Sequence, residues 1–304
     1  MRKKILIALV VMLALYLGAA WYFAGEITAF QVKTFDDVLK EDHITGYSDV
    51  GLPRPVEARV KSDDIEISGW LFLNPRPENC GVVMHHGHVS NRMGNLKFAR
   101  LFWRRGCHIL TFDARHHGES GGAYGTWGFK EKNDLVNVVN WFMEKTGLRP
   151  EQTGIYGSSM GASIVLQAAP LLPNLAFAAV DSPFRDLKSI LIFRGVASYG
   201  KPLLVLYPAA AFFAGLRGGF QVDEVSPLLS ARNITIPVFI VHNQDDDAIP
   251  YVYSQEIFDA IPGKNKILHL PEKGGGHCKL IDTDPVLYEK WIDEFLTAYA
   301  PGFK

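Results

Sequence analysis

Short apolar runs alternate along most of the chain with longer segments in which apolar residues recur at helical spacing. An apolar run without polar alternation is typical of a strand that is buried on both faces. The runs predict strands at residues 81–85, 108–113, 153–156, 176–181, 237–242 and 266–270. The segments of helical period predict helices at residues 93–105, 130–145, 160–169, 251–261 and 285–299. This order predicts an α/β fold, with a mostly parallel sheet and helices on both of its faces.

A different pattern precedes the first of these strands. Residues 57–61 and 66–73 alternate polar and apolar positions on either side of Asp63-Asp64, and this pattern predicts a β-hairpin. Residues 24–55 are interpreted as a linker and entry segment, which ends at Pro53-Arg54-Pro55.

The N-terminus carries a long apolar run. Arg2, Lys3 and Lys4 precede residues 5–23, which contain no charged side chain. A helix of this length roughly matches the hydrocarbon thickness of a bilayer. We therefore expect residues 1–25 to form a transmembrane anchor whose cationic end stays in the cytoplasm. Residues 26–304 would then form a domain on the extracytoplasmic side.

Two other interpretations of this segment remain open. Gly18-Ala19-Ala20 is an acceptable cleavage site for a signal peptide, and a cleaved protein would be secreted. A buried core helix is the third interpretation. The length of the run and the Trp21-Tyr22-Phe23 triplet, which resembles the aromatic belt of a membrane interface, favour the anchor.

One stretch is too long for the regular alternation of strands and helices. About 55 residues separate Asp181 from Ile236, where a single helix would be enough. Residues 190–193 and 203–213 within it are strongly apolar, and an unstructured loop of this length is rare in a compact domain. We expect a small helical cap at about residues 184–232, inserted over the C-terminal edge of the sheet. An additional buried core helix is the alternative.

Composition and charge restrict the classes of function. The 304 residues are 48% hydrophobic and 21% charged, as is usual for a folded globular protein. The formal net charge of −1 and the lack of a basic stripe argue against a nucleic-acid partner. The chain has three cysteines, Cys80, Cys107 and Cys278. They form no C-x-x-C motif and allow one disulfide at most.

The sequence Gly157-Ser158-Ser159-Met160-Gly161 lies between a predicted strand and a predicted helix. In that context G-x-S-x-G is typical of a nucleophile elbow, a strained turn that exposes a serine hydroxyl. Small residues two positions before and after the serine let strand and helix pass closely. The helix N-terminus directs its positive dipole toward a developing oxyanion. Ser159 is therefore the candidate nucleophile, and Ser158 occupies the wrong position in the motif.

A serine hydroxyl needs a general base, which a third group must orient. In a site built on such an elbow the chain order is Ser, then Asp or Glu, then His. His242 and His269 fall within predicted strands and are interpreted as core or edge residues. His277 follows Gly274-Gly275-Gly276 on a loop after the last predicted core strand, so His277 is the candidate base.

The acidic run Asp245-Asp246-Asp247 follows the strand predicted at residues 237–242 and offers the orienting acid. Consecutive side chains point apart, and no partner cluster accompanies them. One carboxylate that orients the histidine is therefore a simpler interpretation than a metal site. The residues alone do not rank the three.

Together these features resemble the α/β-hydrolase superfamily, in particular its lysophospholipase-like and prolyl-oligopeptidase-like serine hydrolases. The resemblance covers about residues 56–299, some four fifths of the chain. The motifs that carry it are His86-Gly87, Asp113-Ala114-Arg115, Gly118-Glu119-Ser120, Gly157-Ser158-Ser159-Met160-Gly161, Asp181-Ser182-Pro183, the acidic turn that ends at Pro250, and Gly275-Gly276-His277.

The resemblance implies the remaining site residues. The triad acid of the family usually stands four residues before the proline of the acidic turn, which is Asp246 here, with Asp245 and Asp247 as alternatives. The oxyanion hole would consist of the backbone N–H groups of His88 and Met160. Neither a cofactor nor a metal ion is expected.

One motif departs from the family. Where the family commonly has Arg-Gly-x-Gly, this chain reads Arg115-His116-His117-Gly118. Adjacent histidines rarely converge on one metal ion, so a metal site is not expected here. Asp113 and Arg115 are expected to form an ion pair that braces the loop.

The sequence thus predicts a serine hydrolase that cleaves carboxylic esters by a Ser-His-Asp acyl-enzyme mechanism. An apolar cap close to a membrane favours a small-molecule ester with an acyl chain, such as a lysophospholipid or a monoacylglycerol. Peptidase, amidase and thioesterase activities are alternatives within the same fold. A catalytically inactive binding module tethered to the membrane is an alternative from another class. The sequence does not indicate an oligomeric state.

Overall fold

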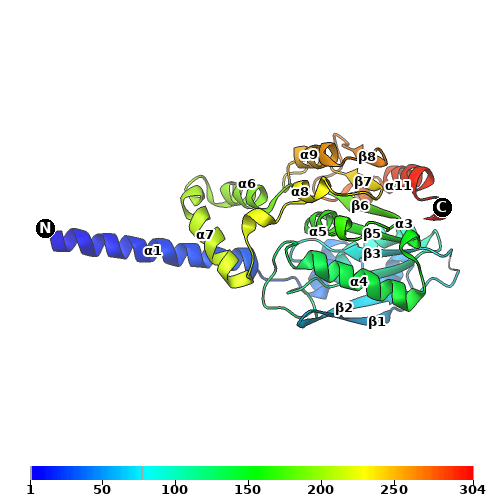
Figure 1. The fold of residues 1–304 in the computed structure, drawn as a ribbon, viewed down its shortest axis with the longest axis horizontal. Coiled ribbons are helices and arrows are strands. Elements are labelled where there is room, and N and C mark those ends of the chain that lie inside the picture. The colour runs from blue at the N-terminus through cyan, green and yellow to red at the C-terminus, as the bar shows by residue number, and fades with distance from the viewer. Residues whose placement is uncertain (1, 77, 304) are drawn as a thin grey trace.

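The computed structural model describes residues 2–76 and 78–303 of the protein (Figure 1). Its centre is an eight-stranded sheet with the strand order β1-β2-β4-β3-β5-β6-β7-β8. Strands β1 and β2 pair antiparallel, as do β2 and β4, whereas the other neighbours are parallel. The prediction of a mostly parallel sheet is confirmed. The strands are β1 (Val56–Ser62), β2 (Ile65–Phe72), β3 (Gly81–His85), β4 (His108–Phe112), β5 (Thr153–Ser158), β6 (Phe177–Asp181), β7 (Val238–Val241) and β8 (Lys266–His269).

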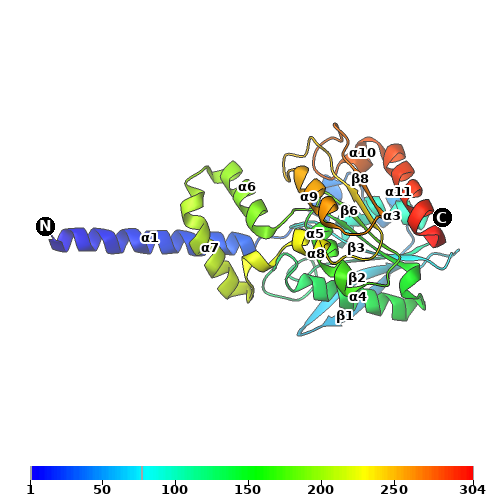
Figure 2. The same cartoon turned by 45° about the horizontal axis from the view of Figure 1, so that its top comes forward.

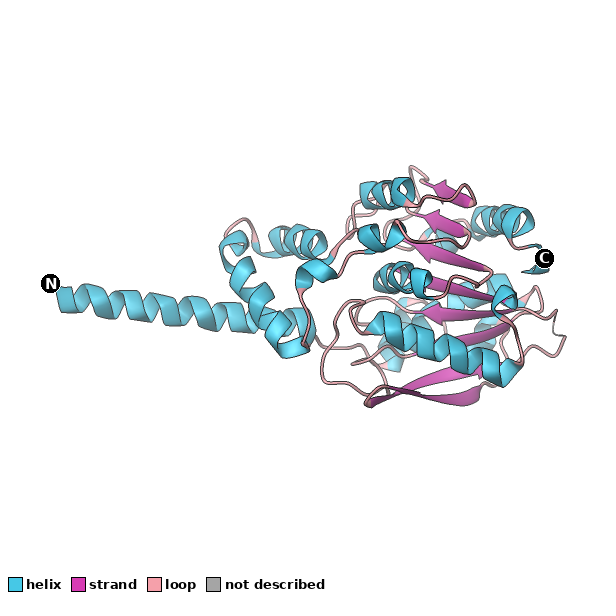
Figure 3. Cartoon of the chain, viewed as in Figure 1, coloured by secondary structure: helices cyan, strands magenta, loops and turns pink. Residues whose placement is uncertain are grey.

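Helices cover both faces of the sheet, as predicted (Figure 3). One face packs against α4 (Glu131–Thr146), α5 (Met160–Ala168), α8 (Pro227–Ala231) and α9 (Val252–Ala260). The other face packs against α3 (Leu96–Trp103), α10 (Leu280–Thr283) and α11 (Pro285–Tyr299). Val82 and Met84 of β3 enter one core, while Val83 enters the other. A strand that serves two cores must be apolar throughout, which explains the runs without alternation. Short 3-10 helices lie at Arg92–Asn95, Pro150–Gln152, Ala169–Leu171, Val222–Glu224 and Pro301–Phe303.

The segment interpreted as a linker contains structure of its own. Helix α2 (Phe35–Glu41) begins after Thr34, whose side chain accepts a hydrogen bond from the backbone N–H of Asp37. A 3-10 helix follows at Tyr47–Val50. Val38 and Leu52 are buried in the core that α3 and α11 share. The linker interpretation is therefore wrong, because this segment contributes apolar side chains to the core.

Helix α1 (Arg2–Thr28) carries the N-terminal apolar run and extends away from the sheet (Figure 1). Most of its apolar side chains are exposed. Among the residues that the structure describes, it is the one unbroken helix long and apolar enough to cross a membrane. A core helix would be buried along its length, so that interpretation is wrong. A membrane anchor and a signal peptide both fit the helix.

The stretch that we interpreted as a cap contains two long helices, in addition to the short α8 that packs on the sheet. Helix α6 (Leu187–Tyr199) and helix α7 (Leu203–Gly218) lie beside α1 and away from the two helical layers (Figure 2). The buried residues of α7 are the small ones Ala210, Ala214 and Gly218. An additional core helix would bury large apolar side chains, and those of α7 are mostly exposed or half-buried.

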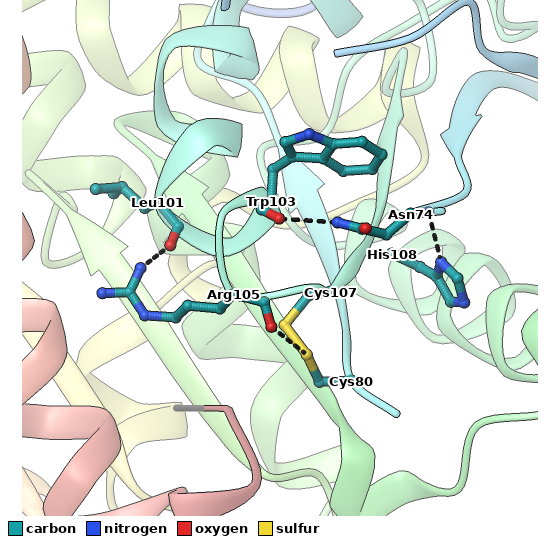
Figure 4. Close-up of a disulfide and its surroundings, with 7 residues drawn as sticks. All are labelled: Asn74, Cys80, Leu101, Trp103, Arg105, Cys107 and His108. Atoms are coloured by element: carbon teal, nitrogen blue, oxygen red, sulfur yellow. Dashed lines mark hydrogen bonds between the residues drawn. A yellow bond between two sulfur atoms is a disulfide. The ribbon is translucent and has the colours of Figure 1, made fainter. Parts of the chain in front are cut away.

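Cys80 and Cys107 form a disulfide (Figure 4), and Cys278 is free and buried. The two linked cysteines directly precede β3 and β4, whose first residues Gly81 and His108 are register partners. The bridge therefore joins the N-terminal ends of two central strands. It lies at the sheet edge opposite to the one at which parallel strands present their carboxyl ends.

Candidate active site

Ser159 lies in a sharp turn between β5 and α5. Its backbone has φ +56° and ψ −121°, a conformation that is strained for any residue other than glycine. A Cβ atom on Gly157 would lie 2.4 Å from Gly161 O, and one on Gly161 would lie 2.1 Å from His85 O. Only glycine fits at both positions, because the two strands and the helix approach so closely. The turn has the geometry of a nucleophile elbow.

Ser159, His277 and Asp246 form one hydrogen-bonded line. Ser159 Oγ lies 2.8 Å from His277 Nε2, and His277 Nδ1 lies 2.6 Å from Asp246 Oδ2. With Nδ1–H donating to the carboxylate, Nε2 is free to accept the hydroxyl proton of the serine. The structure thus brings together three predicted residues that are distant in sequence. Ser159 and His277 are 118 positions apart, and Asp246 and His277 are 31 positions apart.

Four groups hold the Asp246 carboxylate. Oδ1 accepts hydrogen bonds from the backbone N–H groups of Ala248 and Ile249, both at 2.9 Å. Oδ2 accepts one from His277 and lies 3.1 Å from His242 Nε2. Burial by itself would raise the pKa of Asp246, but the hydrogen bonds from His242 and His277 hold that pKa well below its usual range. Asp246 is therefore the anionic end of the line.

His242 is a site residue that the sequence interpretation missed. Its ring is buried directly after β7, with Nδ1 2.7 Å from Ser254 Oγ and Nε2 3.0 Å from Ile249 O. A carbonyl oxygen only accepts, so Nε2 of His242 carries the proton and also donates toward Asp246. Nδ1 accepts a hydrogen bond from the Ser254 hydroxyl. The available signal was its spacing, four residues before an acid in a tight turn.

The two other carboxylates of the acidic turn do not reach His277. Asp245 is exposed and accepts hydrogen bonds at 3.1 Å from two backbone N–H groups of the glycine loop 274–276. These hydrogen bonds lower the pKa of Asp245. Asn243 donates to the same loop at 2.6 Å, and Asp247 is exposed. Asp245 and Asn243 thus fix the loop that carries His277.

His277 is placed to act as a base, with 26% of its side chain exposed. Burial opposes its protonation, but the neighbouring Cys278 sulfur and the hydrogen bond and charge of Asp246 together raise the pKa of His277 above the ordinary 6.5. The Cys278 sulfur lies 3.8 Å from Nε2, and burial raises the pKa of this thiol.

Comparisons with known proteins place this site in a family. A model of the alpha/beta hydrolase family matches residues 82–290, more than half of the chain. The matched region contains Ser159, Asp246 and His277. The chain belongs to the alpha/beta hydrolase family.

Several proteins resemble this hydrolase. Protein YqkD of Bacillus subtilis is 31% identical over 300 residues, which is 97% of each chain. Human protein ABHD12B is 24% identical over 199 residues, 62% of this chain and 52% of that protein. An esterase of Pyrococcus furiosus has a TM-score of 0.69 at 23% identity, over 84% of this chain and 94% of its own. An acylaminoacyl peptidase of Pyrococcus horikoshii has a TM-score of 0.63 at 18% identity, over 81% of this chain and 41% of its own. The solved structures share the fold.

The loop after β3 of the hydrolase contacts Ser159. A Cβ atom on Gly87 would lie 3.2 Å from Ser159 Cβ and 3.7 Å from its Oγ. His88 follows Gly87, and Met160 follows Ser159. Within residues 2–76 and 78–303, the N–H groups of His88 and Met160 donate to no other protein group. Free N–H groups on segments that contact the serine are what an oxyanion hole requires.

The prediction that Asp113 and Arg115 form an ion pair is wrong. Asp113 binds the buried Arg92, with Nη2 and Oδ2 2.7 Å apart, and Arg115 binds Asp134 of α4, with Nε and Oδ2 2.6 Å apart. Each side chain finds its partner on a different element. Both ion pairs still brace the loop after β4.

His86 connects two loops near the site. Its Nε2 accepts a hydrogen bond from the backbone N–H of Ala114 at 2.9 Å, and its Nδ1 donates to Gly87 O at 2.7 Å. These bonds fix the orientation of the loop that carries Gly87. In the described part of the chain, no group of three or more His, Cys, Asp or Glu side chains is placed to hold a metal ion.

Two hollows meet at His88. One, of about 150 Å³, is lined by Ser159 and His277 together with charged residues such as Lys33. The other, of about 180 Å³, is lined mainly by side chains of α1, α6 and α7. The His88 ring stacks on Trp127 at a centroid distance of 4.5 Å, and burial lowers the pKa of His88 to about 3. The neutral ring thus separates a charged hollow from an apolar one.

Proposed function

We propose that this protein is a serine hydrolase that cleaves carboxylic esters through an acyl-enzyme. The observation that carries the proposal is the line from Ser159 Oγ to His277 Nε2 at 2.8 Å and from His277 Nδ1 to Asp246 Oδ2 at 2.6 Å. The low pKa of Asp246 supports its role as the anion that orients and strengthens the base.

The reaction proceeds in two halves. His277 Nε2 takes the proton of Ser159 Oγ while that oxygen attacks the ester carbonyl carbon. The oxyanion that forms accepts hydrogen bonds from the N–H groups of His88 and Met160, each worth about 3 kcal/mol in comparable sites. The imidazolium then protonates the leaving alcohol, and the acyl group stays on the serine. In the second half His277 deprotonates a water molecule as the water oxygen attacks the acyl carbon. The imidazolium then returns the proton to Ser159 Oγ while the bond from this oxygen to the acyl carbon breaks, and the acid leaves.

The first test is labelling of the full-length protein by a fluorophosphonate probe. Ser159→Ala should lose labelling, and its turnover of p-nitrophenyl esters should fall about a millionfold. Ser158→Ala is the matched control and should keep both, because its hydroxyl donates to Asn95 Oδ1 at 3.0 Å instead of joining the line. Labelling that persists without the Ser159 hydroxyl would exclude Ser159 as nucleophile. A wild-type protein that does not label would favour an inactive binding module.

The substrate class that we favour is an ester with one acyl chain, such as a lysophospholipid or a monoacylglycerol. The apolar hollow beside His88 suits an alkyl chain, and the charged hollow at Ser159 suits a polar alcohol. An esterase and a peptidase both share the fold. Turnover of p-nitrophenyl esters of increasing length should therefore be compared with that of aminoacyl naphthylamides, and faster amide cleavage would contradict the ester preference.

We also propose that α1 anchors the enzyme in a membrane, with the catalytic domain on the extracytoplasmic side. Arg2, Lys3 and Lys4 flank the apolar helix at the end that would stay cytoplasmic. The disulfide between Cys80 and Cys107 supports this side, because disulfides persist mainly in oxidising compartments. Carbonate extraction should leave the protein in the membrane fraction with residues 1–20 intact. A soluble protein that begins near Trp21 would identify α1 as a signal peptide.

A further inference from the structure

The C-terminal half of α1 is packed against α7 (Figure 2). The rings of Trp21 and Phe213 meet edge to face at a centroid distance of 5.6 Å. The Arg217 guanidinium lies 4.1 Å from the centre of the Trp21 ring, a cation–π contact. Nearer the N-terminus, Tyr16 donates a hydrogen bond to Val205 O at 3.0 Å. The two helices are therefore in contact from Tyr16 onward.

Small residues bring the backbones of these two helices together. Ala24 and Ile27 of α1 form a buried apolar cluster with Ala210 and Ala214 of α7. Small side chains at a helix–helix contact are typical of association within membranes, where close van der Waals packing takes the place of the hydrophobic effect.

The same end of α1 is joined to the segments around the active site. Trp127 Nε1 donates a hydrogen bond to Ile27 O at 2.8 Å. Phe30 follows α1 closely, and its ring lies 4.4 Å from that of His88. Helix α1 is thus fixed to the catalytic domain by direct contacts, in addition to the chain connection.

The apolar hollow beside His88 has α1 as one of its walls. Phe23 of α1, Leu191 of α6 and Leu203 of α7 line it, and His88 lies between it and the hollow at Ser159. Its interior is suited to an alkyl chain, because the lining is mostly apolar. The charged residues of its lining, both exposed, are Glu26 and Arg194.

The outer surface of α7 is apolar as well. Val205, Phe212 and Leu216 are 70%, 61% and 65% exposed. A helix that is apolar on all sides and not enclosed by protein is typical of a lipid environment. This surface continues the exposed apolar surface of α1, so that one bilayer would cover both.

The contacts between the helices define how deeply α7 would lie. With residues 5–23 across the bilayer, Phe23 is near the outer boundary and Tyr16 lies about 10 Å deeper, since each helical residue rises about 1.5 Å. Val205, which Tyr16 contacts, lies at the same depth. The first turns of α7 are then among the acyl chains of the outer leaflet.

We propose that α1 is a permanent wall of the substrate site and that the α6–α7 hairpin is immersed in the outer leaflet beside it. The acyl chain of a membrane ester enters the hollow from the leaflet, between α1, α6 and α7, and its carbonyl group reaches Ser159 past His88. This inference rests on the esterase function and the membrane anchor proposed above.

A crosslinking experiment tests the path of the chain. Full-length protein in phosphatidylcholine vesicles is treated with an alkyl fluorophosphonate whose chain ends in a diazirine, then illuminated and mapped by mass spectrometry. We expect the chain end to crosslink to residues 23–27 of α1 and to Leu203 or Tyr207 of α7. Crosslinks confined to the charged hollow, at Lys33 and its neighbours, would overturn the inference. Failure of Ser159 to react at all would instead contradict the proposed catalytic function.

A matched pair of variants tests the same hollow through turnover. Leu203 lines the hollow, whereas its neighbour Leu204 is exposed outside it. Leu203→Trp should lower the ratio of long-chain to short-chain p-nitrophenyl ester turnover about tenfold, because the added ring fills the space of the chain. Leu204→Trp should leave the ratio unchanged. A wild-type ratio in Leu203→Trp would mean that the acyl chain binds elsewhere.

Immersion of α7 has a separate readout. Val205→Cys, labelled with an environment-sensitive fluorophore, should be quenched by brominated phosphatidylcholine in the vesicles. The same label at Val286→Cys, an exposed position on α11, should not be quenched. Equal quenching, or none, at the two positions would contradict the immersion of the hairpin.

Discussion

His242 Nε2 lies 3.1 Å from Asp246 Oδ2, the oxygen that also accepts the hydrogen bond from His277. Both side chains of this pair are fully buried. A buried carboxylate is stabilised as an anion only when donors surround it. His242 therefore holds Asp246 ionised and oriented, and in the proposed reaction it is a positioning residue that acts through Asp246.

Replacing His242 by leucine should lower kcat about tenfold or more, because a hydrogen bond to a buried charge is lost. The KM for a p-nitrophenyl ester should change little, since His242 does not line the hollow at Ser159. His242→Gln keeps a donor that can reach toward Asp246 and should recover part of the loss. Steady-state kinetics and melting temperatures should be measured together. Equal losses of activity and stability in both variants would indicate a purely structural role.

The pH dependence of the reaction should report the titration of His277. Only the neutral imidazole accepts the serine proton, so kcat/KM should fall as the pH decreases through the pKa of His277, which lies above 6.5 and to which the Asp246 charge contributes. Asp246→Asn removes the raising charge, so the acid limb should move to lower pH while kcat drops about ten-thousandfold. The profile is measured with a short p-nitrophenyl ester.

Asp245→Asn is the control for this profile. Asp245 contacts the glycine loop and not the imidazole, so the acid limb should stay at its wild-type position. If Asp245→Asn shifted the acid limb and Asp246→Asn did not, Asp245 would be the acid that orients His277.

How well each site residue could be predicted depends on whether the residues that identify it are close to it in the sequence. The elbow is local in sequence, because Gly157 and Gly161 flank Ser159 within five residues, although the close contact of Gly161 is with His85 O of β3. The choice among three adjacent carboxylates is not local. It depends on which one the turn after β7 directs at a histidine 31 positions later, and only the family resemblance favoured Asp246. His242 was overlooked because a histidine in a strand pattern is usually a core residue.

The fold shows the same limit. The strands and the covering helices could be predicted because the spacing of apolar residues within each element indicates which of its faces are buried. The contact between α1 and α7 could not, because both helices are apolar almost all round and neither pattern marks a preferred face. Ala24 and Ala214, which meet in that contact, are unremarkable in sequence. Partner choice between distant elements, as for Arg92 with Asp113, likewise depends on tertiary structure.

Gly161→Ala tests the close approach beneath the elbow. The added Cβ would lie 2.1 Å from a backbone carbonyl oxygen, His85 O, which cannot move aside without shifting β3. We expect a loss of about 1–3 kcal/mol of stability together with the loss of fluorophosphonate labelling. Gly263→Ala is the control, because its Cβ would point into open space. Thermal unfolding and labelling of the two variants should differ clearly; identical behaviour would mean that the elbow is looser than this geometry.

The disulfide offers a test of stability that is independent of the chemistry. Replacing both Cys80 and Cys107 by alanine should lower the free energy of unfolding by about 3 kcal/mol, since the bridge closes a loop between cysteines 27 positions apart. The activity of the folded protein should persist, because the bridge joins the start of β3 to the start of β4 and Ser159 lies at the other sheet edge. Urea unfolding in detergent micelles gives the first quantity and ester hydrolysis the second. Alkylation of the unreduced, unfolded wild type should modify Cys278 alone. Three modified cysteines would show that the bridge does not form in the cell, and the extracytoplasmic assignment would lose that support.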